Sequence, residues 1–259
     1  MFQNKRLFAS LLILVFVCLS NPVAAELADT IEKVKPSVVG VGTLLKIRRP
    51  PAKLLGTGFA VANGRYVVTN AHVIPAELDY EKNEVLAVFI GTGKEAIVRP
   101  AELLKSDPVH DLALLKVEDF RLPDMKLGKM DTVREGQLYA FTGFPIGAVI
   151  GLYPVTHRGI VSAITPIVIP VKSTNQLDAA MIRRLRNPYD IIQLDATAYP
   201  GNSGSPLYDV ETGTVVGVIN KVFVKESKEK VLEKPSGITY AIPVTYVHQL
   251  LKDAGVKIN

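Results

Sequence analysis

Short apolar segments bounded by glycine, proline or asparagine recur along most of this sequence. They are not separated by the amphipathic helical segments that alternate with the strands of a parallel sheet. Many short strands with turn residues between them are typical of all-β barrels and sandwiches. We therefore predict an all-β fold of two antiparallel six-stranded β-barrels, followed by a C-terminal helix.

The apolar segments also give the expected positions of the strands. The first barrel is expected at about residues 37–118 and the second at about 137–242, with residues 118–133 as the connector. First-barrel strands are expected at 37–45, 56–62, 66–69, 85–91, 96–104 and 111–117. Second-barrel strands are expected at 137–141, 155–164, 191–195, 206–208, 215–219 and 238–242. Helical spacing of apolar residues predicts helices at 28–35 and 244–254.

The first 25 residues have the three parts of a secretory signal peptide. Lys5 and Arg6 provide the positive start, residues 7–19 the apolar run, and residues 23–25 a small-residue cleavage site. The alternative is an uncleaved anchor, but the apolar run is shorter than the ~20 residues of a spanning helix. We therefore expect cleavage after residue 25 and a periplasmic or secreted protein.

The expected mature chain, residues 26–259, has no cysteine, because Cys18 lies inside the signal peptide. Its stability must then come from the core and not from disulfides. Without Lys5 and Arg6 it retains 28 basic and 25 acidic side chains, a net charge of +3. This charge is too small to indicate nucleic-acid binding or attraction to a membrane surface, and no second apolar stretch is long enough for stable membrane insertion.

The segment GNSGSP, residues 201–206, is the best candidate for a catalytic turn. Ser203 lies between two glycines, which allow a tight turn that exposes its hydroxyl for nucleophilic attack. The backbone N–H groups of Gly201 and Ser203 would form the oxyanion hole. Glycine-rich and serine-rich segments are more often ordinary loops, so this motif gains weight only in combination with others.

Two upstream segments supply the partners that a serine nucleophile needs. His72, in TNAHV, would act as the general base, and Asp111, in DLALLKV, would orient the imidazole and stabilise its charged form. Each residue alone has a structural interpretation, whereas the order His72, Asp111, Ser203 is that of one known catalytic triad. No cofactor is expected, and no cluster with metal-ligand spacing is present.

TNAHV, DLALLKV and GNSGSP together resemble the trypsin-like serine proteases, and among them the bacterial HtrA (Deg) group. The resemblance implies a protease domain over residues 26–259, with the active site between two barrels and no PDZ domain. One departure is Ser205, where HtrA proteins usually have glycine and where glutamyl endopeptidases have serine. By this resemblance, Thr197, Ala198, Ile219 and Asn220 would bind the substrate, with a preference for small aliphatic P1 residues in unfolded or extended protein segments.

The segment 176–187 is an insert with helical spacing and a basic side made of Arg183, Arg184 and Arg186. By position it resembles the loop through which HtrA proteases sense activating ligands. The insert would then bind an acidic regulatory partner or a neighbouring subunit of a homo-oligomer; the alternative is solvated surface. The alternative for the whole chain is a catalytically weak or inactive peptide-binding module with a protease fold.

Overall fold

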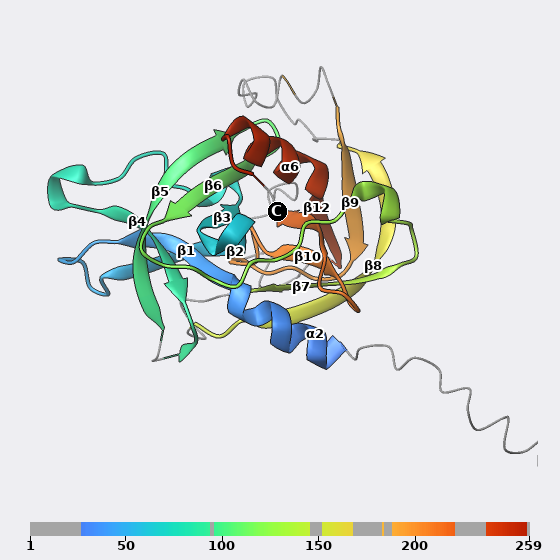
Figure 1. Ribbon diagram of the computed structural model, residues 1–259, viewed down its shortest axis with the longest axis horizontal. Coiled ribbons are helices and arrows are strands. Elements are labelled where there is room, and N and C mark those ends of the chain that lie inside the picture. The colour runs from blue at the N-terminus through green and yellow to red at the C-terminus, as the bar shows by residue number, and fades with distance from the viewer. Residues whose placement is uncertain are drawn as a thin grey trace, which may run out of the picture.

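The computed structural model describes residues 27–93, 96–145, 152–167, 183, 188–220 and 237–257. Its strands form two closed, six-stranded antiparallel barrels that lie next to each other (Figure 1). This confirms the predicted fold class. The expected signal peptide, and all of the basic insert except Arg183, lie outside the described residues.

The first barrel has the strand order β1-β2-β3-β6-β5-β4. Its strands are β1 (Val38–Leu44), β2 (Ala52–Val61), β3 (Tyr66–Thr69), β4 (Val85–Ile90), β5 (Ile97–Asp107) and β6 (Leu112–Val117). Two strands are longer than predicted. Residues 52–54 extend β2 by pairing with β1, and residues 105–107 extend β5 by pairing with β6. These extensions are exposed or half-buried, so they lack the apolar run that marks the rest of the wall.

The second barrel has the strand order β10-β11-β12-β9-β8-β7. Its strands are β7 (Leu138–Gly143), β8 (Val155–Pro166), β9 (Asp190–Asp195), β10 (Pro206–Asp209), β11 (Val215–Asn220) and β12 (Ile238–Pro243). Short 3-10 helices are η1 (Lys35–Ser37), η2 (Ala62–Gly64), η3 (Ala71–Val73), η4 (Tyr80–Lys82) and η6 (Met130–Thr132).

Among the residues that the structure describes, the α-helices α2 and α6 pack on the outside of the barrels. The first, α2 (Leu27–Val34), buries Thr30 and Val34, and the Thr30 hydroxyl donates to the backbone carbonyl of Glu211. The second, α6 (Val244–Asp253), contacts β5 and β6 of the first barrel and β11 and β12 of the second (Figure 1). Because α6 touches both barrels, it helps to fix their relative position.

The core consists mainly of three clusters of buried side chains. One fills the first barrel, a second fills the other barrel, and a third joins both barrels to α6. Strand β2 packs against two of these clusters, one on each face. Phe59 and Val61 belong to the cluster shared by both barrels, while Ala60 belongs to the cluster inside the first barrel. Both faces of such a strand are apolar, since both are buried. This explains the continuous apolar runs in the barrel walls.

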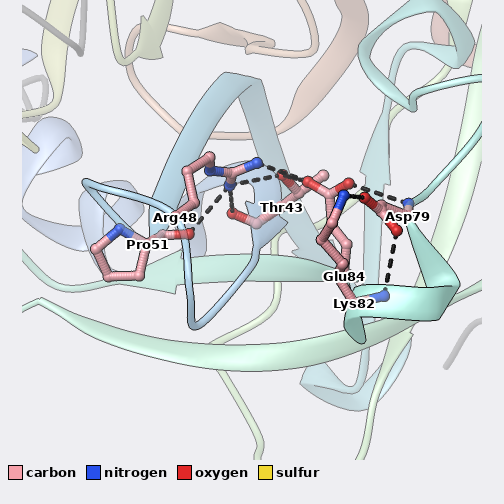
Figure 2. A network of polar contacts seen from close by, with 6 residues as sticks. All are labelled: Thr43, Arg48, Pro51, Asp79, Lys82 and Glu84. Atoms are coloured by element: carbon pink, nitrogen blue, oxygen red, sulfur yellow. Dashed lines mark hydrogen bonds and ion pairs between the residues drawn. The ribbon is translucent and has the colours of Figure 1, made fainter.

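A polar network joins the turn after β1 to the segment that precedes β4 in the first barrel (Figure 2). Arg48, in the turn between β1 and β2, forms an ion pair of 2.7 Å with Glu84 and donates to the carbonyls of Thr43 and Pro51. Glu84 also accepts hydrogen bonds from the Thr43 hydroxyl (2.7 Å) and the Asp79 N–H (3.2 Å). These contacts lower the pKa of Glu84, with the Thr43 hydrogen bond as the largest cause.

We expect Glu84→Gln to lower the free energy of unfolding at neutral pH by about 1–2 kcal/mol, because hydrogen bonds to a charged acceptor are lost. The pKa of Glu84 in the folded protein lies below its unfolded value of about 4.3. The stabilisation is therefore present above that value and is lost as the pH falls through the folded pKa. Denaturant unfolding at neutral pH measures the stability with Glu84 charged, and unfolding at about pH 3 measures it after the stabilisation has begun to be lost.

The exposed residue Glu81 provides a matched control, since its side chain makes no hydrogen bond to any described residue. Glu81→Gln should leave the free energy of unfolding nearly unchanged at either pH. A Glu84→Gln deficit of the same size at both pH values would show that the carboxylate charge does not stabilise this network.

Candidate active site

His72 and Asp111 are brought together by neighbouring strands of the first barrel. His72 lies in η3, directly after β3, and Asp111 directly precedes β6. Because β3 and β6 pair antiparallel, with Thr69 opposite Ala113, the end of one strand meets the start of the other. The imidazole Nδ1 of His72 lies 2.6 Å from Oδ2 of Asp111, and the His72 N–H donates to Oδ1 at 2.9 Å. One carboxylate thus fixes both the backbone and the ring of His72.

Asp111 is buried, with 6% of its surface exposed, and its backbone has a φ of 54°. A buried carboxylate is tolerated only when donors surround it. A further donor comes from the second barrel, where Nδ2 of Asn220 lies 2.7 Å from Oδ2 of Asp111. The Asp111 carbonyl accepts from the Ala71 N–H and the Asn70 amide at 3.1 and 3.0 Å. Asn220, predicted to bind substrate, is buried and contacts Asp111 directly.

Ser203 lies in the tight turn that precedes β10, as the flanking glycines predict. Gly201 and Gly204 have φ angles of 101° and 88°, values that residues other than glycine rarely adopt. A Cβ at Gly204 would also overlap the carbonyl oxygen of Thr57. The turn therefore requires glycine at 204 for conformation and for space.

The backbone N–H groups of the serine turn divide into two sets. Those of Asn202, Gly204 and Ser205 donate to backbone carbonyls at 3.0, 2.9 and 3.0 Å. Those of Gly201 and Ser203 donate to no other described residue. These two donors are the pair that the sequence predicts for an oxyanion hole. Their geometry leaves them available to a negatively charged oxygen.

The serine turn lies against the segment that carries His72. The Thr57 N–H donates to the Ser203 carbonyl at 2.9 Å. A Cβ on Gly56 would lie 2.7 Å from a methyl group of Val73 and 3.0 Å from that carbonyl oxygen. Between the described side chains of Ser203 and His72 no hydrogen bond is formed. Hydrogen bonds between catalytic groups are often long in the absence of substrate and tighten when it binds.

The other histidines have structural surroundings. His110 stacks on Tyr246 with ring centroids 3.8 Å apart, and His157 stacks on Phe141 at 5.0 Å. Burial lowers the pKa of His157. His248 lies 2.9 Å from a backbone carbonyl of the connector. Within the described ranges, no group of three or more His, Cys, Asp and Glu side chains is placed to hold a metal ion.

The predicted substrate pocket is described only in part. Ala198 and Ile219 are buried and belong to the core cluster of the second barrel, and Thr197 is half-buried. Residues 221–236, which follow β11, lie outside the described residues. Arg183 is exposed, and Arg184 and Arg186 of the basic insert lie outside the described residues. The P1 preference and the role of the insert therefore stay predictions.

Two closed barrels with a His–Asp pair and a glycine-flanked serine turn at their junction define the chymotrypsin-like class of folds. A family model described as "Trypsin-like peptidase domain" matches residues 56–218, which is more than half of the sequence. The chain therefore belongs to the trypsin-like peptidase family. This confirms the family resemblance that the three sequence motifs indicate.

Several relatives are of the HtrA type. The "Probable periplasmic serine endoprotease DegP-like" of Halomonas elongata is 32% identical over 190 residues, which cover 73% of this chain and 33% of that protein. "Serine protease HTRA4" of Homo sapiens is 31% identical over 231 residues, covering 88% of this chain and 41% of that protein. The chain thus spans less than half the length of these two curated relatives.

Solved structures of HtrA-type proteases have the same fold. One described as "HtrA-type protease AlgW with decapeptide" has a TM-score of 0.63 and 26% sequence identity, covering 89% of this chain and 67% of that one. "HtrA-type protease AlgWS227A with tripeptide" has a TM-score of 0.62 and 27% identity, covering 88% and 63%. In the part of this chain that the structure describes, the helices are too short or too polar to cross a membrane.

Proposed function

We propose that this chain is an exported serine endopeptidase whose catalytic triad is His72, Asp111 and Ser203. The observation that carries the proposal is the contact between the exposed His72 and the buried Asp111, 2.6 Å apart, beside a serine turn in which the N–H groups of Gly201 and Ser203 donate to no other described residue. A hydroxyl is a weak nucleophile at neutral pH and needs a base next to it. The family membership and the proteases among its relatives support the same activity.

The residues divide the reaction in the following way. Oγ of Ser203 attacks the scissile carbonyl carbon and transfers its proton to Nε2 of His72. The carbonyl oxygen becomes an oxyanion and accepts hydrogen bonds from the N–H groups of Gly201 and Ser203. The imidazolium, stabilised by Asp111, then protonates the leaving amine as the C–N bond breaks. Water hydrolyses the acyl-enzyme through the same base and returns the free hydroxyl.

The site of action is the periplasm or the exterior of the cell. The sequence supports this through its signal-peptide pattern at residues 1–25, and two bacterial relatives are named periplasmic endoproteases. The substrates are proteins with unfolded or extended segments. An acidic regulatory partner, or a second copy of the chain, would bind at the basic insert.

We expect cleavage after Val, Ala, Ile or Leu, because Ala198 and Ile219 bound the proposed P1 pocket. None of the residues assigned to this pocket has a carboxylate, including Thr197 and Asn220. A buried Lys or Arg side chain would lack a partner there. Discrimination among aliphatic residues should be modest, since one methylene is worth ~1–3 kcal/mol. Mass-spectrometric mapping of the cuts in denatured casein tests this specificity. A majority of cuts after Lys, Arg or Glu would show that the pocket is wrongly assigned.

A non-cleaving peptide-binding module is the second candidate function. The observation that favours it is Ser205, which stands where HtrA proteins usually have glycine. The two functions differ in the reactivity of Ser203, because a fluorophosphonate labels only an activated serine. The casein experiment separates them as well, since a binding module would leave the substrate intact.

A further inference from the structure

Thr57, in β2 of the first barrel, makes two hydrogen bonds to the serine turn of the second barrel. Its N–H donates to the carbonyl of Ser203 at 2.9 Å, and its hydroxyl donates to the carbonyl of Gly201 at 2.7 Å. Thr57 is fully buried, and its own carbonyl accepts a hydrogen bond of 2.6 Å from the Thr69 hydroxyl. The residue is therefore held firmly by its own barrel while it contacts the other.

The direction of the Thr57 hydroxyl is fixed by a second contact. The N–H of Phe144, directly after β7, donates to the same oxygen at 3.0 Å. A hydroxyl has one proton to donate, and the Phe144 N–H occupies one of its acceptor positions. The proton of the Thr57 hydroxyl is thus directed to Gly201.

These contacts hold the peptide groups between Gly201 and Asn202 and between Ser203 and Gly204, which adjoin the peptide groups that carry the Gly201 and Ser203 N–H. The carbonyls of Gly201 and Ser203 both point toward Thr57, while the N–H groups of the same two residues bond to no other described residue. Rotation of the peptide between Gly201 and Asn202 would break the bond to the Thr57 hydroxyl. We propose that Thr57 is a positioning residue, which holds the serine turn with the Gly201 and Ser203 N–H groups directed at the oxyanion. This inference rests on the proposed function.

No neighbouring side chain replaces the Thr57 hydroxyl. The amide of Asn202 and the hydroxyl of Ser205 are buried and have no hydrogen-bond partner among the described residues, so neither donates to Gly201. A Cβ at Gly143 would lie 2.9 Å from Oγ1 of Thr57 and would overlap the Ser205 hydroxyl. Loss of the Thr57 hydroxyl would therefore leave the Gly201 carbonyl without its side-chain donor among the described residues.

Thr57→Val removes the hydroxyl and keeps the shape of the side chain and the backbone bond to Ser203. We expect kcat for a peptide substrate, expressed per titrated active site, to fall by about 10²-fold, as when one oxyanion-hole donor is lost. KM should change little, because ground-state binding does not use the oxyanion hole. Thr57→Ser should restore kcat to within about threefold, since the hydroxyl is present again.

Thr43→Val is the matched control. It also removes a buried, hydrogen-bonded hydroxyl from the first barrel, but that hydroxyl bonds Glu84 and lies outside the serine turn. It should lower the melting temperature and leave kcat per active site unchanged. Titration with a fluorophosphonate excludes unfolded molecules from the count, so a loss of stability alone does not lower this kcat. If Thr57→Val gives no titratable protein, Thr57→Ala takes its place with the same expectation.

Three results would overturn the inference. The first is a Thr57→Val enzyme with wild-type kcat per site, and the second is a Thr57→Ser enzyme as impaired as Thr57→Val. Both leave the proposed function intact, because the wild-type protein is then active. The third is a wild-type protein that neither cleaves peptides nor reacts with the probe. That result would end the proposed function and the inference together.

Discussion

Ser203→Ala is expected to lower peptide hydrolysis by about 10⁶-fold, which corresponds to about 8 kcal/mol in the activation free energy. The substitution removes the atom that attacks the carbonyl carbon. The Gly201 and Ser203 N–H groups remain, so a small residual rate from oxyanion stabilisation should persist. Initial rates with a chromogenic peptide give the ratio of the wild-type and Ser203→Ala activities. The variant is measured at an enzyme concentration high enough to detect its residual rate.

Ser205→Ala is the control for the nucleophile, because Ser205 lies in the same turn and its buried hydroxyl has no partner among the described residues. We expect its activity to stay within a few-fold of wild type. Both variants should unfold at nearly the wild-type temperature. A Ser203→Ala protein that keeps most of the activity would refute the assignment of the nucleophile.

Asp111→Asn is expected to lower kcat by about 10⁴-fold. The carboxylate now accepts hydrogen bonds from the ring and the backbone N–H of His72 and from the amide of Asn220. An asparagine has only one acceptor oxygen, so its NH₂ group would face one of these donors or turn Nδ1 of the imidazole into an acceptor. The ring would then hold the tautomer that cannot accept the serine proton. Steady-state kinetics at saturating peptide measure the effect.

The chain contains a second aspartate–histidine pair that serves as the control. Asp107 and His110 are also 2.6 Å apart, but His110 stacks on Tyr246 of α6. Asp107→Asn should therefore affect stability and leave kcat within a few-fold of wild type. Equal losses of kcat in Asp107→Asn and Asp111→Asn would contradict the proposed role of Asp111.

The strands were predictable because each barrel wall separates two apolar regions. Strand β3 has the predicted bounds, and most other strands agree within two residues at each end. The sequence gives no sign of the first residues of β2 or the last residues of β5. Those residues pair with neighbouring strands but are exposed or only half-buried, so they lack the continuous apolar run that marks the other strands.

The site was predictable where chemistry restricts the residue type. His72 and Asp111 were expected as partners, and the structure places them in contact. The contact between Asn220 and Asp111 was not expected, because it joins two barrels and no sequence spacing reports it. Thr57 was also missed, although it lies between Gly56 and Gly58. Glycine inside a strand indicates the close approach of another backbone, and next to Gly56 that backbone is the serine turn.

The central claim is that Ser203 is an activated nucleophile, and covalent labelling tests it most directly. The purified protein is treated with a fluorophosphonate, digested, and the modified residue located by tandem mass spectrometry. The account predicts one modification per chain, on Ser203, which is abolished in Ser203→Ala and strongly slowed in His72→Ala. Failure of the folded wild-type protein to label, or labelling at another serine, would contradict it.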